Sequence, residues 1–106
     1  MTVGEWLDAR SAEAPQALAR RVREIVAPHA GADASRACEL CLAAGEMLLA
    51  ELLRDGCASR QSALDLLAVD ALVTYAFEAA GAEPGMLDGR AHRAMVGISA
   101  LANVPA

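Results

Sequence analysis

The stretch SALDLLAVDALVTYAFEAAG, which runs from Ser62 to Gly81, decides the fold of this chain. It is rich in Ala and Leu, two of the strongest helix formers, and it lacks the alternation of apolar and polar residues that is typical of a β-strand. The rest of the chain has the same character, because 56% of its 106 residues are apolar and β-branched residues are few. The sequence therefore predicts an all-α fold.

Breakers and capping signals divide the chain into five helices. The first begins at Thr2, which fits a capping box with Glu5. The expected helices cover about residues 2–11, 15–28, 33–55, 59–81 and 84–101, where the third starts at 33 or 34, the fourth at 59 or 62, and the fifth between 84 and 87. We expect a single helical domain over residues 1–106. Its architecture is predicted as a small antiparallel helical bundle, with three long helices plus a shorter N-terminal helix pair.

Three acidic residues interrupt the apolar stretch. Asp65 lies three residues after Ser62, so the two fit a second capping box, and we interpret Asp65 as a first-turn residue that gains from the helix dipole. Asp70, Thr74 and Glu78 are spaced by four residues and form a polar seam about 80° wide on the helix. The rest of the circumference is apolar, which is more than a helix on the outside of a small bundle usually shows.

A helix with so little polar surface needs cover on more than one side. We expect that two or three neighbouring helices of a small bundle cannot easily supply this cover, whereas a second copy of the chain can. The sequence therefore predicts a homodimer in which this helix contributes to the interface. A helical protein partner would satisfy the same physics. The candidate binding residues are Asp70, Thr74, Tyr75 and Glu78.

The cysteines are interpreted as packing residues. Cys38 and Cys41 match C-x-x-C, but they lie a turn inside the third expected helix, in line with Gly45 on its apolar face. Redox cysteines favour a helix N-terminus, and a zinc site needs two further ligands that no second C-x-x-C or H-x-x-x-H supplies. We therefore expect a strip of small residues that lets another helix approach closely, and no metal or cofactor. Cys57, in a loop, is the most reactive thiol.

The titratable residues form no recognisable catalytic set. His92 lies four residues after Asp88, which is typical of a surface pair on a helix, and His29 lies in a loop. Glu-x-x-His pairs, which hold di-metal centres in helical bundles, do not occur in the sequence. We therefore favour a protein without catalysis.

The charge pattern excludes several partners. A net charge of −5 argues against nucleic-acid binding, which needs a basic face. We interpret the basic cluster 20–23 as a solvated helix face, with a docking patch for an acidic partner as the alternative. Three acids make Ser62–Gly81 too costly for a membrane span. The start of the sequence lacks a secretion signal, and three cysteines, an odd number, indicate reduced thiols and a cytoplasmic location.

One segment carries a local resemblance. AVDALVTYAFEAAG, from Ala68 to Gly81, resembles the "GDAL…AFE" helix of trans-prenyl diphosphate synthases, with Val69 at the position where that family usually has Gly. The aspartate-rich segments that hold Mg²⁺ and diphosphate in that family do not occur in this sequence, so no catalytic residue carries over. The resemblance implies a noncatalytic relative or partner of such an enzyme.

These observations predict a small cytoplasmic interaction or accessory module that is non-catalytic and homodimeric. Two alternatives remain. One is a bundle that binds a small apolar or prenyl-like molecule between its helices, with Tyr75, Trp6 and one acid as polar contacts. The other is an acid-dependent enzyme of unrecognised type.

Overall fold

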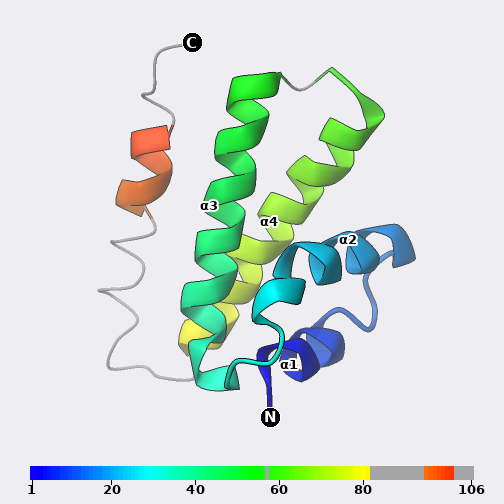
Figure 1. Ribbon diagram of the computed structural model, residues 1–106, viewed down its shortest axis with the longest axis vertical. Helices are drawn as coiled ribbons and strands as arrows, with labels where there is room; N and C mark the ends of the chain where they lie inside the picture. The colour runs from blue at the N-terminus through cyan, green and yellow to red at the C-terminus, as the bar shows by residue number, and fades with distance from the viewer. Residues whose placement is uncertain (57, 82–94, 102–106) are drawn as a thin grey trace.

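The computed structural model describes residues 1–56, 58–81 and 95–101, and these residues are mostly helical, with no β-strand among them. The all-α expectation is confirmed for this part of the chain. Figure 1 shows how the helices are arranged. Their bounds are α1 Val3–Arg10, α2 Gln16–Val26, α3 Ala37–Asp55 and α4 Arg60–Gly81. Short 3₁₀ helices lie at Ala27–His29 (η1) and Ala34–Arg36 (η2), and residues 95–101 form a further short helical segment.

Helices α3 and α4 form a hairpin, lying side by side with the chain reversing direction between them (Figure 1). Gly56 ends α3 at a φ of 86°, a value that favours glycine, and its N–H donates to the carbonyl of Leu52 over 2.9 Å. The hydroxyl oxygen of Ser59 accepts the N–H of Ser62 over 3.0 Å, so Ser59 caps the start of α4. Local signals therefore fix both ends of this connection.

The contact between α3 and α4 is close because it passes over a small residue. A Cβ atom added to Gly45 would lie 3.5 Å from the Cβ of Leu72 and 3.5 Å from the Cγ2 of Val73. Cys38 and Cys41 are buried on the same face of α3. The strip of small residues that the sequence predicts is confirmed, and α4 is the helix that approaches it.

The N-terminal helices α1 and α2 pack on one side of this hairpin (Figure 1). The predicted capping box begins α1: the Thr2 hydroxyl accepts the Glu5 N–H over 3.2 Å, and the Glu5 carboxylate accepts the Thr2 N–H over 3.0 Å. Buried apolar side chains then join all four helices into one core: Val3, Leu7, Val22, Val26, Ala37, Cys38, Cys41, Leu48, Leu52, Ala68, Leu72, Ala76 and Ala80.

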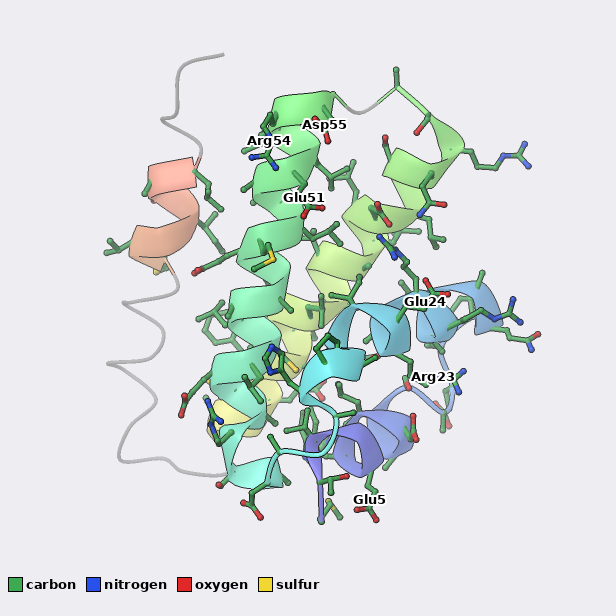
Figure 2. All side chains as sticks on the ribbon, viewed as in Figure 1. Glu5, Arg23, Glu24, Glu51, Arg54 and Asp55 are labelled. Atoms are coloured by element: carbon green, nitrogen blue, oxygen red, sulfur yellow. The ribbon has the colours of Figure 1, made fainter. Side chains whose placement is uncertain are left out.

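Residues 95–101 lie beside α3, where Gly97 meets the Glu46 carboxylate. They fall within the fifth expected helix and are helical as expected. The start of that helix, together with Cys57, Asp88 and His92, lies outside the described residues. The solvent side of α3 carries charged residues together with the exposed Met47 and Leu53, and Figure 2 shows Glu51, Arg54 and Asp55 near its end.

Candidate interaction surface

From Ser62 onward, the exposed positions of α4 gather on one side of the helix. At 100° per residue they span an arc of about 120°. We call this arc the open face of α4; from Ser62 onward it consists of the exposed residues Ala63, Leu66, Leu67, Asp70, Thr74, Phe77, Glu78 and Gly81. It contains the predicted polar seam and, beside it, Leu66 and Phe77.

The chain itself covers more of α4 than the sequence suggested. Helix α3 packs along α4, α2 contacts α4 through Arg21 and Asp65, and α1 contacts it through Trp6 and Tyr75. The expectation that a small bundle cannot cover this helix is therefore wrong for most of its circumference. Three large apolar side chains remain in water, with exposed fractions of 41% at Leu66, 57% at Leu67 and 38% at Phe77.

Asp70 and Thr74 lie on the open face, as their spacing predicts. The Thr74 hydroxyl donates to the backbone carbonyl of Asp70 over 2.9 Å, a bond within the helix that satisfies the hydroxyl locally. The Asp70 carboxylate is exposed and has no hydrogen-bond or ion-pair partner among residues 1–56, 58–81 and 95–101. Neither side chain contributes to a preformed site.

Tyr75 and Glu78 belong to a different arrangement, at the boundary between α4 and α1. Glu78 forms an ion pair with Arg10 over 3.3 Å, and the Arg10 guanidinium lies 5.1 Å from the centre of the Trp6 ring. Trp6 meets Tyr75 edge to face, with ring centres 6.4 Å apart. Burial raises the pKa of the Tyr75 phenol, and the nearby Glu78 carboxylate adds to this effect. The contacts of Arg10 and Trp6 with Glu78 and Tyr75 hold α1 against α4.

Asp65 has a role that its position in the sequence did not indicate. The capping-box interpretation is wrong, because α4 begins earlier, at Arg60, and because the Asp65 side chain is buried against α2. Its carboxylate accepts two hydrogen bonds from Arg21, from Nε over 2.7 Å and from Nη2 over 3.4 Å, and a third from Gln61 over 3.0 Å. This is a bidentate arginine–carboxylate pair, the strongest geometry for such a contact.

The basic cluster of α2 is therefore divided between two environments. Arg20 and Arg23 are exposed, as expected for a solvated face, but Arg21 is half-buried between Asp65 and Glu24, with the Glu24 carboxylate at 3.3 Å. The hydrogen bonding that Arg21 donates to the Asp65 carboxylate is the main reason that the pKa of Arg21 is raised. One member of the cluster is thus a packing residue.

The buried thiol of Cys41 is a weak acid. Burial raises the pKa of Cys41 to about 12, so the thiol stays protonated near neutral pH and is a poor nucleophile. Within the part of the chain that the structure describes, no three residues among His, Cys, Asp and Glu are grouped closely enough to hold a metal ion.

A surface cavity of about 280 Å³ lies beside α1 and the start of α2. Its lining combines one acid, one arginine and small residues: Asp8, Ser11, Ala12, Ala14, Gln16, Ala19 and Arg23. None of the residues predicted to bind a ligand lines it. The polar contacts expected for a small-molecule site, Tyr75 and Trp6, contact each other elsewhere.

No protein family, curated protein or solved structure matches the chain. The local resemblance of residues 68–81 to prenyl diphosphate synthases therefore gains no support from other proteins. Among the described helices, none combines the length and the apolar character needed to cross a membrane.

Proposed function

We propose that this chain is a small helical interaction module of the cytoplasm, without catalytic activity, and that it forms a homodimer through the open face of α4. The proposal includes the complete antiparallel bundle of three long helices and a shorter N-terminal pair. A helical protein partner on the same face is the alternative.

The observation that supports the proposal is the presence of Leu66, Leu67 and Phe77 on the open face. Their exposed fractions lie between 38% and 57%, and removing apolar surface from water contributes about 25 cal/mol per Å². Grouped apolar side chains on one helix are typical of an interaction surface.

Sedimentation velocity and light scattering over a dilution series test the proposal. We expect a dimer that dissociates on dilution. Leu67→Glu should leave the chain folded, by circular dichroism, and monomeric, because it places a charge in the interface. The matched control is Leu53→Glu on α3, since Leu53 is 53% exposed and Leu67 is 57% exposed. This control should remain a dimer. A native chain that stays monomeric at high micromolar concentration contradicts the proposal.

A further inference from the structure

Six residues of the open face follow a spacing of alternating four and three residues along α4. This is the spacing of the a and d positions of a coiled coil, which brings one narrow stripe of a helix against a single partner helix. We call these residues the a/d stripe, and all of them are exposed: Ala63, Leu67, Asp70, Thr74, Phe77 and Gly81.

The a/d stripe differs from the face that α4 uses inside its own chain. The buried residues of α4 are Asp65, Ala68, Leu72, Ala76 and Ala80, which lie on the other side of the helix. Contacts with α1, α2 and α3 therefore do not account for the repeat. Its spacing fits one further helix, which α1, α2 and α3 do not supply.

We infer that the a/d stripe pairs with the a/d stripe of a second copy of the chain, in an antiparallel coiled coil that centres at the level of Leu72. This inference rests on the proposed homodimer and specifies its geometry. With Leu67, Thr74 and Gly81 as a positions, each a residue faces a d residue of the partner.

The resulting layers are complementary under a twofold axis. Leu67 packs against the partner's Phe77, so the large apolar side chains meet on both sides of the centre. Gly81 lies against the partner's Ala63, and two small residues let the ends of the helices approach. Thr74 faces the partner's Asp70, where its hydroxyl can turn away from its own helix and donate to the carboxylate.

The charge of Asp70 selects this orientation over the parallel one. In a parallel pair, residues of the same kind face each other, so the two Asp70 carboxylates would share one layer and repel. The antiparallel pair offsets them along the axis and gives each a hydroxyl donor. A single polar layer in a coiled-coil interface also fixes the register.

Disulfide trapping tests this geometry. Ala63→Cys and Gly81→Cys are prepared separately in a Cys57→Ser background, which serves as the control, and are oxidised alone and as a mixture. Peptide mass spectrometry identifies the linked residues. We expect the mixed disulfide between Cys at 63 and Cys at 81 to exceed either self-disulfide. Both sites suit Cys, since Ala63 and Gly81 are exposed and, among the described residues outside its own stretch of helix, none has an atom within 4 Å of a Cβ added to Gly81.

The outcomes separate the two proposals. Self-disulfides at residue 63 would mean a parallel pair and would overturn the antiparallel inference while leaving the dimer. A dimer in sedimentation without the mixed disulfide would overturn the inference too, provided that Asp70→Cys mixed with Thr74→Cys also fails to link. A native chain that is monomeric at the same concentration would overturn both the homodimer and its geometry.

Discussion

Replacing Arg21 by Ala should destabilise the fold far more than replacing its neighbour Arg20. Arg21 is the main partner of the buried Asp65 carboxylate, and without it that carboxylate keeps only the hydrogen bond from Gln61. Removing one partner of a buried ion pair costs about 3–5 kcal/mol. The side chains of Arg21 and Asp65 are 27% and 11% exposed, so water can partly replace the guanidinium. We therefore expect a loss of about 2–3 kcal/mol.

Urea unfolding followed by circular dichroism measures this loss. With an m-value of about 1.5 kcal/mol/M, which is typical of small domains, the midpoint should fall by roughly 1.3–2 M for Arg21→Ala. Arg20→Ala is the matched control, because Arg20 is exposed on the same helix, and it should change stability by less than about 0.5 kcal/mol. A double variant, Arg21→Met with Asp65→Leu, should recover much of the stability, because it removes both buried charges.

Two results would refute this reasoning. Equal midpoints for Arg21→Ala and Arg20→Ala would mean that the pair makes no net contribution. The second result is that the losses of Arg21→Met and Asp65→Leu, measured separately, add up to the loss of the double variant. That result would mean that the two residues act independently and that Arg21 matters only through the packing of its aliphatic stem.

Three further predictions follow from the packing and the pKa shifts. Gly45→Ala should be neutral or stabilising by up to about 1 kcal/mol in urea unfolding, because an added Cβ meets Leu72 at an ordinary contact distance, whereas Gly45→Leu should destabilise by about 1–3 kcal/mol. The Cys41 thiol, whose pKa is raised from 9.0 to about 12, should favour the folded state fully below pH 9 and lose this contribution as the pH rises toward 12; unfolding midpoints that stay constant over this range would contradict it. Hydrogen bonds from Thr2 lower the pKa of Glu5, so the capping box should stabilise the fold above the unfolded-state pKa and weaken as the pH falls through the folded-state pKa; by NMR titration, Thr2→Ala should raise the pKa of Glu5.

The features that the sequence predicted correctly are those with local causes. The capping box of Thr2 and Glu5 depends on residues three positions apart, and the stop at Gly56 depends on one residue's backbone freedom. The burial of Cys41 follows from helical periodicity alone. In each case the signal and the structure that it determines lie within one helix turn or one face.

The ion pairs could not be predicted, because they join residues that only tertiary packing brings together. Arg21 and Asp65 are 44 residues apart, and Arg10 and Glu78 are 68 apart. Within α4, Asp65 looked like a capping residue because a local explanation was sufficient. Its buried partner lies on α2, and the pattern Arg20-Arg21-Val22-Arg23 does not show which arginine turns inward.

The position of α4 explains why its apolar excess and its polar seam can coexist. Helix α3 contacts α4 at Leu72 and Val73, α2 contacts it at Asp65, and α1 contacts it at Tyr75. These contacts use most of the circumference and leave an arc of about 120°. On that arc Leu67 and Phe77 flank Asp70, at the spacing by which one helix meets another. An arc that only needed solvation would not require large apolar side chains at these two positions, and the proposed antiparallel pair gives each of them an apolar neighbour, because it sets Leu67 against the partner's Phe77.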